Sequence, residues 1–225
     1  MTLYSYCLRF DDGAAPNPYW GTCTLAICKP AIRRTAQKGD WVVGHGSTSE
    51  WDHRDISRSL VYAMKITDVL TMKGYDAFCR RSLPEKIPNW TNSDFQRKVG
   101  DCIYEFGVSG EPILRGGVHS EQNRETDLSG ENVLLSNHFY YFGDKPTPLP
   151  ESLVGIVHPM QGHRSRANDP YAAEFLKWVE GRGWPKNTLI GEPQLKNRIL
   201  RMSEEECRGV CSKEHRVDNE HDCAY

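Results

Sequence analysis

The stretch Gly162-His163-Arg164-Ser165-Arg166 combines an imidazole with two guanidinium groups just before a helix that is predicted to start at Asp169. A helix N-terminus offers unpaired backbone N–H groups, and arginine binds phosphate and carboxylate through charge-assisted hydrogen bonds. The stretch therefore indicates an anion site around His163 and Arg164. The competing interpretation is a solvated loop, because the Asp169 carboxylate would occupy the same N–H groups.

A second candidate is Gly44-His45-Gly46, which follows a short apolar strand. Glycines on both sides allow the backbone to approach a flat ligand closely, and His45 could hydrogen-bond the edge of a base. A structural bulge with a solvent-facing histidine explains the same pattern, and spacing alone favours it. The two interpretations stay open at this stage.

Aromatic side chains gather in Phe139-Tyr140-Tyr141-Phe142 and at Trp41. Neighbours on a strand point to opposite faces, so this run places aromatic rings on both faces of one strand. Core packing is the default explanation for most of them. The face that does not pack inward would be free to stack on a base.

The C-terminal region carries Cys207, Cys211 and His215, and Ser203 with Glu206 forms a capping-box pattern before them. A helix starting there would place both cysteines on one face, as a zinc site requires. No other cofactor is expected. The alternative is an acidic, disordered tail with incidental thiols, since the spacing matches no standard zinc finger.

The elements that must position these residues are predicted from periodicity and from start and stop signals. Leu3 to Phe10 alternates as a strand, and Asp169 to Glu180 repeats apolar residues as an amphipathic helix ending at Gly181. The remaining predictions are a helix over 30–38, strands over 40–43, 60–66, 133–135, 138–142 and 153–158, and an irregular stretch over 79–130. This order predicts an α+β fold with a curled, mostly antiparallel sheet flanked by helices.

Composition limits the class of protein. The 225 residues suit one domain with an appendage, and a net charge of −2 gives no global basic field for nucleic acid. No apolar run is long enough to span a membrane and the N-terminus does not resemble a signal peptide, so we expect a cytoplasmic protein with no membrane partner. The eight cysteines are then free thiols or metal ligands. No Walker loop, dinucleotide fingerprint, nucleophile elbow or His-Glu-x-x-His motif occurs.

Two long stretches carry a resemblance to known folds. AIRRTAQKGDWVVGHGS followed by LVYAMKITDVLTMKGYDAF resembles the layout of PUA-like domains of the EVE, YTH and ASCH branches. That resemblance implies a small curled β-barrel, flanked by short helices, that receives nucleobases, often modified ones, in an aromatic pocket. The segment 79–130 is longer than the matching part of a compact EVE domain.

The chain is also similar to the family called nucleotide modification associated domain 2, over roughly residues 1–180. The resemblance rests on RFDDGAAPNPYWGTCTLAICKPAIR, GDWVVGHGS, LVYAMKIT, FYYFG and the late GHRS. It implies a role in hypermodification of DNA bases, mainly in phages and bacteria. We therefore expect a PUA-like domain over 1–184 and a C-terminal appendage over 185–225 that is partly helical or disordered.

The resemblance also implies roles for individual residues around one pocket. Phosphate contacts are expected from Lys29, Arg33, Arg34, His163 and Arg164. Base contacts are expected from Trp41, Tyr140 and Tyr141 by stacking, and from His45, Ser47, Asp11 and Asn17 by hydrogen bonding. A base in duplex DNA would have to be extruded to reach such a pocket.

Three functions remain open. The first is a domain that binds DNA, RNA or a nucleotide and reads a modified base. The second is an enzyme acting on a base or nucleotide, with His163 or His45 as general acid-base and Asp11 as its partner. The third is an interaction module whose Cys207–Cys211 tail recruits a base-modifying enzyme. Turnover distinguishes the first two, and deletion of residues 185–225 tests the third.

Overall fold

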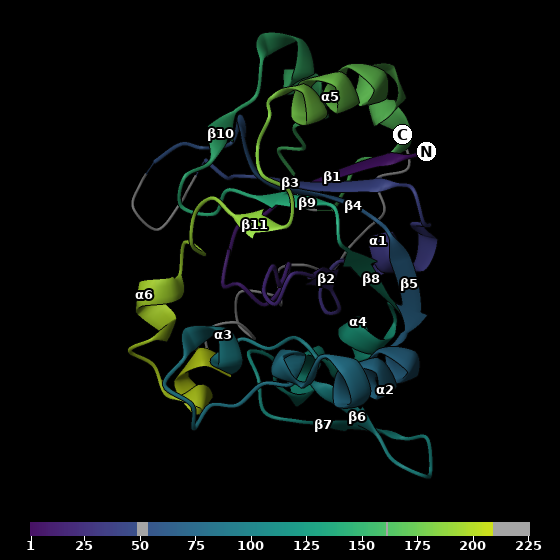
Figure 1. Ribbon diagram of the computed structural model, residues 1–225, viewed down its shortest axis with the longest axis vertical. Helices are drawn as coiled ribbons and strands as arrows, with labels where there is room; N and C mark the ends of the chain where they lie inside the picture. The colour runs from purple at the N-terminus through teal and green to yellow at the C-terminus, as the bar shows by residue number, and fades with distance from the viewer. Residues whose placement is uncertain (49–53, 161, 209–225) are drawn as a thin grey trace.

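The computed structural model describes residues 1–48, 54–160 and 162–208, whose strands form three sheets. The main sheet has the order β1-β3-β4-β9-β11, and β10 also pairs with β4 (Figure 1). Its strands are β1 (Leu3–Cys7), β3 (Trp41–His45), β4 (Ser59–Lys65), β9 (Phe139–Tyr141), β10 (Thr147–Pro148) and β11 (Thr188–Leu189). The pairs β1–β3 and β9–β11 are parallel, and the other pairs of this sheet are antiparallel.

The second sheet is continuous with the first through two bent segments. Its order is β2 (Cys23–Leu25), β8 (Asn132–Ser136) and β5 (Asp68–Thr71). β4 bends into β5 while β8 bends into β9, and the antiparallel pairing carries through the bend, where Thr67 N–H donates to Leu135 O over 2.9 Å. The sheet is therefore strongly curled. A third sheet is the hairpin of β6 (Tyr104–Phe106) and β7 (Pro112–Leu114).

The curled sheet does not close into a barrel within the described residues. Closure would require β1 to pair with β2, but each of these edges bonds another segment. Ser5 on β1 forms a bridge with Arg164, and Thr24 on β2 forms a bridge with Asn17 in the proline-rich loop. The mixed α+β class is thus confirmed, whereas the closed PUA-like barrel is not.

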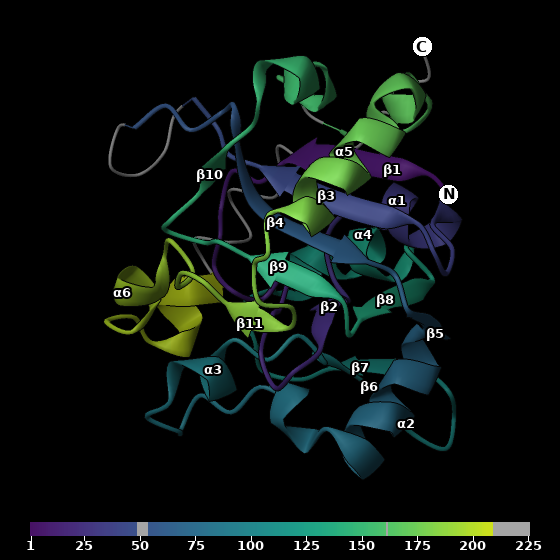
Figure 2. The same ribbon diagram turned by 45° about the horizontal axis from the view of Figure 1, so that its top comes forward.

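Helices cover both sides of this sheet (Figures 1 and 2). α5 (Asp169–Gly181) lies over one face of the main sheet, as its predicted apolar stripe requires. The other helices are α1 (Pro30–Thr35), α2 (Met72–Ser82), α3 (Phe95–Lys98), α4 (Arg124–Leu128) and α6 (Lys196–Ile199), with short 3₁₀ turns η1 (Pro84–Lys86), η2 (Glu121–Asn123), η3 (Glu151–Ile156) and η4 (Arg166–Asn168). The predicted strand over 153–158 is wrong, because Pro150 starts the 3₁₀ turn η3 at that place, with Leu153 N–H donating to Pro150 O.

Two hydrophobic cores form on the two faces of the main sheet. Trp41 and Val43 belong to the core beneath α5, whereas Val42 between them belongs to the larger core on the other face. The alternation is that of a strand with both faces covered. This is why the aromatic run 139–142 is entirely buried.

Residues 185–208 take part in both the sheet and the larger core. β11 pairs with β9 in parallel, and Leu195, Ile199 and Cys207 are buried in the larger core. The remaining residues of the predicted appendage, 209–225, lie outside the described part of the chain. Among the helices described, none has both the length and the apolar character that crossing a membrane requires.

Candidate active site

A strained connection between β2 and α1 presents Cys28. Cys28 has φ 59° and Lys29 has φ 41°, both in the left-handed region that residues with a Cβ seldom occupy. Such strain persists only where the surroundings hold it, and it concentrates at functional sites. Here the backbone is held from both sides, because Cys28 N–H donates to Asp127 Oδ1 over 3.1 Å and Arg33 Nε donates to Cys28 O over 2.8 Å.

The thiol of Cys28 faces a histidine that is itself held by a carboxylate. The sulfur lies 3.6 Å from His119 Nε2, and His119 Nδ1 lies 2.6 Å from Asp127 Oδ2. His119 precedes η2 and Asp127 lies on α4. A nucleophile within reach of a base, with the base oriented by a third group, is the arrangement of covalent catalysts.

The electrostatics of the pair favour a charged imidazole. Both His119 and Asp127 are 1% exposed. Burial by itself lowers the pKa of His119, but the charge of Asp127, the nearby Cys28 and their hydrogen bonds outweigh it and raise that pKa to about 10. Burial likewise opposes ionisation of Asp127, yet the charge and hydrogen bond of His119 hold the pKa of Asp127 below its usual value. A protonated imidazole beside a sulfur stabilises the thiolate, which is the reactive form.

Two buried side chains fix the carboxylate and the strained turn together. Tyr104 hydroxyl donates to Asp127 Oδ2 over 3.1 Å. The fully buried Arg33 guanidinium donates to the backbone oxygens of Cys28, Asp127 and Asn132. Arg33 was predicted to contact phosphate, but its donors serve these internal contacts instead, so it acts as a positioning residue.

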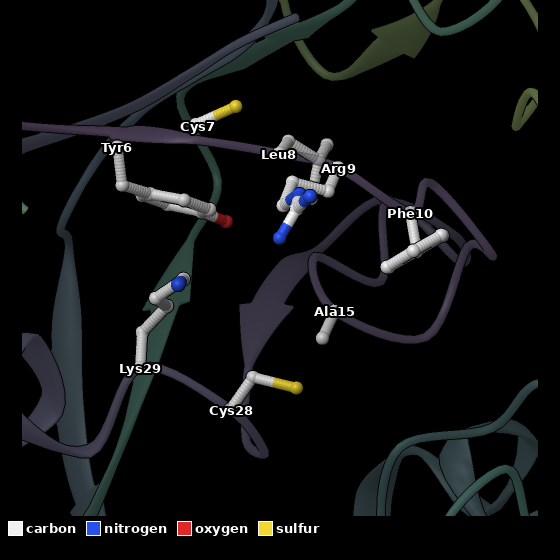
Figure 3. Close-up of a pocket in the computed structure, with 8 residues that line it drawn as sticks. All are labelled: Tyr6, Cys7, Leu8, Arg9, Phe10, Ala15, Cys28 and Lys29. Atoms are coloured by element: carbon white, nitrogen blue, oxygen red, sulfur yellow. The ribbon is translucent and has the colours of Figure 1, made fainter. Parts of the chain in front are cut away.

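A small pocket lies beside the thiol (Figure 3). Its lining comes from the end of β1, the loop after it and the β2–α1 connection: Tyr6, Cys7, Leu8, Arg9, Phe10, Ala15, Cys28 and Lys29. The Lys29 side chain extends toward the Tyr6 ring, with its Nζ 5.0 Å from the ring centroid, whereas the Cys7 sulfur points away from that ring. The cavity is about 20 Å³, enough for about one water molecule.

The predicted base-stacking residues are packed inside the protein. Trp41 and Tyr140 lie in the core beneath α5, and Trp41 contacts Phe175 edge-on. Tyr141 lies in the larger core and donates its hydroxyl proton to Asp11 Oδ1. Asp11 Oδ2 also accepts from Gln194 N–H over 3.2 Å. These side chains stabilise the sheet and its contact with the 185–208 segment.

The residues predicted to read a base edge are also occupied by internal bonds. His45 Nε2 accepts from His158 N–H over 2.9 Å, and its Nδ1 lies 2.8 Å from Gly46 O. Burial lowers the pKa of His45 to about 4, so its ring is neutral at pH 7. Ser47 is buried at the end of the same turn, and Asn17 accepts hydrogen bonds from the buried Lys86 ammonium.

The remaining predicted anion-binding residues lie on other segments. His163 packs against the Tyr4 ring at a centroid distance of 5.9 Å, and Arg164 pairs its backbone with Ser5. Arg34 is exposed on α1 and donates to Ser129 O over 2.8 Å. Of the predicted residues that the structure describes, only Lys29 lines the Cys28 pocket.

The structure describes one of the three predicted zinc ligands. Cys207 is buried in the larger core, while Cys211 and His215 lie outside the described residues. Within residues 1–48, 54–160 and 162–208, no group of three or more histidine, cysteine and acidic side chains could hold a metal ion.

Cys28, His119 and Asp127 were missed by the sequence analysis. One local signal points to Cys28, which lies between an apolar strand and a helix that starts at Pro30. No comparable signal marks its partners, because His119 and Asp127 are 91 and 99 residues further along the chain. Their meeting depends on the fold.

The chain matches a known protein family over most of its length. Residues 1–199 match the family model described as nucleotide modification associated domain 2. None of the curated proteins and none of the solved structures compared with the chain matches it.

Proposed function

Because the chain belongs to the nucleotide modification associated domain 2 family, we propose that it is an enzyme that modifies a nucleotide or a nucleic-acid base and uses Cys28 as covalent nucleophile. The observation that carries this proposal is the line of contacts from Cys28 through His119 to Asp127. The family description itself places the chain in nucleotide modification. It does not specify the chemistry, which the side chains supply.

Each member of the line has a role that follows from its contacts. Cys28 attacks the substrate as a thiolate and forms the covalent bond. His119 Nε2, facing the sulfur, carries the proton to and from the reacting groups. Asp127 holds the imidazole orientation through Nδ1 and stabilises its positive charge.

Nucleobase or nucleotide binding is proposed at the entrance of the same pocket, because the cavity itself holds only about one water molecule. Phe10 offers partly exposed aromatic surface at its wall, and the exposed Arg9 offers positive charge for phosphate. DNA, RNA and free nucleotides all present these groups. The predicted aromatic pocket is thus proposed here at the half-buried Phe10 instead of Trp41 and Tyr140, whose rings are packed in the core.

Thiol reactivity tests the nucleophile directly. The protein would be exposed briefly to iodoacetamide at pH 6.5, and labelling would be followed by peptide mapping. Cys7 is also half-buried and serves as reference within the same molecule. We expect Cys28 to react at least about tenfold faster than Cys7 in the wild type, and to lose this advantage in His119→Gln. Equal rates at both cysteines would refute the proposal.

Turnover tests the enzymatic role. Nucleotides and short DNA and RNA oligonucleotides with plain and modified bases would be incubated with wild type and Cys28→Ala, with products identified by mass spectrometry. We expect product from the wild type and from the control Lys38→Met, which changes an exposed residue outside the pocket lining, and none from Cys28→Ala. Tight binding of a modified base without product, unchanged in Cys28→Ala, would instead make the protein a base-binding domain.

A further inference from the structure

We propose that the Tyr6 hydroxyl is a further catalytic group of this site, and that it donates a hydrogen bond to the substrate oxygen or nitrogen that takes up an electron pair as the Cys28 thiolate attacks. The inference rests on the proposed nucleophile and adds the class of substrate: one with a C=O or C=N group at the attacked carbon or conjugated with it. It is carried by the place of Tyr6 in the pocket and by its hydrogen bond to Tyr62.

Three neighbouring strands bring the two tyrosines together. Tyr6 on β1 and Tyr62 on β4 both stand in register with Gly44 on β3, the strand between them. Residues directly opposite each other point to the same face of a sheet, so a side chain at position 44 would separate the two rings. A Cβ built on Gly44 would lie 2.5 Å from Tyr62 Cε1. Because glycine stands there, the two hydroxyl oxygens meet at 2.8 Å.

This tyrosine pair has one more proton than its mutual hydrogen bond uses. Each hydroxyl carries one proton, and a single bond joins the two groups. Within the described part of the chain, neither hydroxyl has a further hydrogen-bond partner. If Tyr6 were the donor, the second proton would belong to Tyr62, which is 0% exposed and does not line the Cys28 pocket, and a buried donor without an acceptor is costly. The arrangement that avoids this cost has Tyr62 as the donor, and it leaves the Tyr6 O–H directed into the pocket.

The Tyr6 hydroxyl and the Cys28 thiol belong to the same pocket. Tyr6 lines it from β1, and Cys28 lines it from the β2–α1 connection. Figure 3 shows the hydroxyl oxygen pointing from its strand toward the middle of the lining residues. Burial above all, and then the neighbouring Tyr62 and the charge of Cys28, raise the pKa of Tyr6. The hydroxyl therefore keeps its proton at neutral pH and is available as a hydrogen-bond donor.

The attack creates negative charge that a fixed donor stabilises. The thiolate sulfur forms an S–C bond with the substrate carbon, and the π electron pair of that carbon moves onto the oxygen or nitrogen of the C=O or C=N group. Tyr6 donates to this atom and keeps its own proton, while the charged His119 gives the proton that neutralises the adduct. No oxidant or reductant is needed. A donor that is already in place lowers the barrier, because nothing has to reorganise as the charge develops.

Two small neutral electrophiles separate this role from general thiol reactivity. Acrylamide adds through its double bond, and its carbonyl oxygen takes up the charge. Iodomethane reacts by displacement, and the charge leaves with iodide. We would measure the rate constant of each reagent at Cys28 by peptide mapping, with the half-buried Cys7 as reference. Both reactions need the same thiolate, so the ratio of the acrylamide to the iodomethane rate constant reports stabilisation of the developing charge.

Substitutions at the two tyrosines form a matched set. Tyr6→Phe removes the donor into the pocket, whereas Tyr62→Phe removes the other hydroxyl of the same buried pair and keeps that donor. We expect the ratio to fall by about tenfold or more in Tyr6→Phe and to keep its wild-type value in Tyr62→Phe. Tyr6→Phe leaves the buried Tyr62 hydroxyl without an acceptor and can fold poorly for that reason alone. The double variant Tyr6→Phe/Tyr62→Phe has neither hydroxyl and is expected to show the same fall.

The outcomes separate this inference from the proposed function. An equal fall of the ratio in Tyr6→Phe and Tyr62→Phe would reduce the pair to a structural hydrogen bond and overturn the inference. A ratio that stays at the wild-type value in all three variants would likewise refute Tyr6 as a donor to the substrate. In both cases the nucleophile stands, provided that iodomethane labels Cys28 faster than Cys7 in the wild type. If neither reagent favours Cys28 over Cys7, both proposals are wrong.

Discussion

Acidification is predicted to destabilise the fold through His45, a residue that a sequence-based search selects as a catalytic candidate. The folded protein keeps this ring neutral, because burial and the neighbouring His158 lower its pKa from 6.5 to about 4. Above pH 6.5 both the folded and the unfolded states hold a neutral ring, so its contribution to stability is fully present. Between pH 6.5 and 4 the unfolded state binds a proton that the folded state does not, so stability falls as pH falls.

The size of this loss follows from the pKa difference. Each pH unit between the two values is worth about 1.4 kcal/mol, so His45 accounts for about 3 kcal/mol by pH 4. A loss of this size is a large share of the stability of an ordinary domain. Other groups, the carboxylates above all, titrate in the same range, so the contribution of His45 must be read as a difference between two proteins.

Chemical denaturation of wild type and His45→Gln at pH steps between 7.5 and 4.5 measures that difference. A glutamine amide can still accept from His158 N–H and donate to Gly46 O, but it does not titrate. We expect the wild type to lose up to about 3 kcal/mol more than the variant over this range. Parallel curves would refute a buried neutral His45 and would restore it as a candidate acid-base group.

Three further predictions concern the groups around the thiol and the proline-rich loop. Arg33→Met is expected to cost about 3 kcal/mol or more of unfolding free energy, because it leaves three backbone carbonyl oxygens, one buried and two part-buried, without this donor. Arg34→Met on the exposed side of α1 is expected to change the unfolding free energy by less than about 0.5 kcal/mol, and urea denaturation of both variants checks the difference. Gly130→Ala places a methyl group against the Arg33 guanidinium. This variant is expected to slow Cys28 alkylation and to lower the free energy of unfolding by about 1–3 kcal/mol. An alkylation rate equal to that of the wild type would contradict the positioning role of Arg33. Lys86→Met removes a buried ammonium that donates hydrogen bonds to Asn17 in the proline-rich loop. We expect urea unfolding to show a loss of about 3–5 kcal/mol of stability. Wild-type stability in this variant would show that the ammonium is not needed to hold the loop.

Local sequence patterns predicted the elements better than they predicted the site. The helix over Asp169 to Glu180 and the strand that begins at Leu3 both follow from apolar spacing and from proline and glycine at their ends. α2 escaped the sequence analysis, because its capping residue Thr71 ends a strand and its apolar residues follow that strand without a break. The family resemblance was also readable from the sequence alone, and the family match over residues 1–199 confirms it.

Whether an individual side chain is buried or exposed depended on contacts between distant segments. Arg33 and Arg34 are adjacent and chemically identical, yet one is fully buried and the other exposed. Trp41 was assigned to a base pocket from its type, but α5 covers its face of the sheet. Composition and periodicity describe a residue and its near neighbours, and neither reports which distant element will cover it.

The sequence by itself determined the family, the α+β class and the start of a helix at Pro30 just after Cys28. Only the tertiary structure decided that this cysteine meets His119 and Asp127, because the curled sheet brings α4 against the β2–α1 turn across nearly 100 residues of chain. It also decided that the sheet stays open, since loop segments occupy the edges that a barrel would have to join. Both outcomes rest on long-range contacts, whose formation depends on the whole chain folding together.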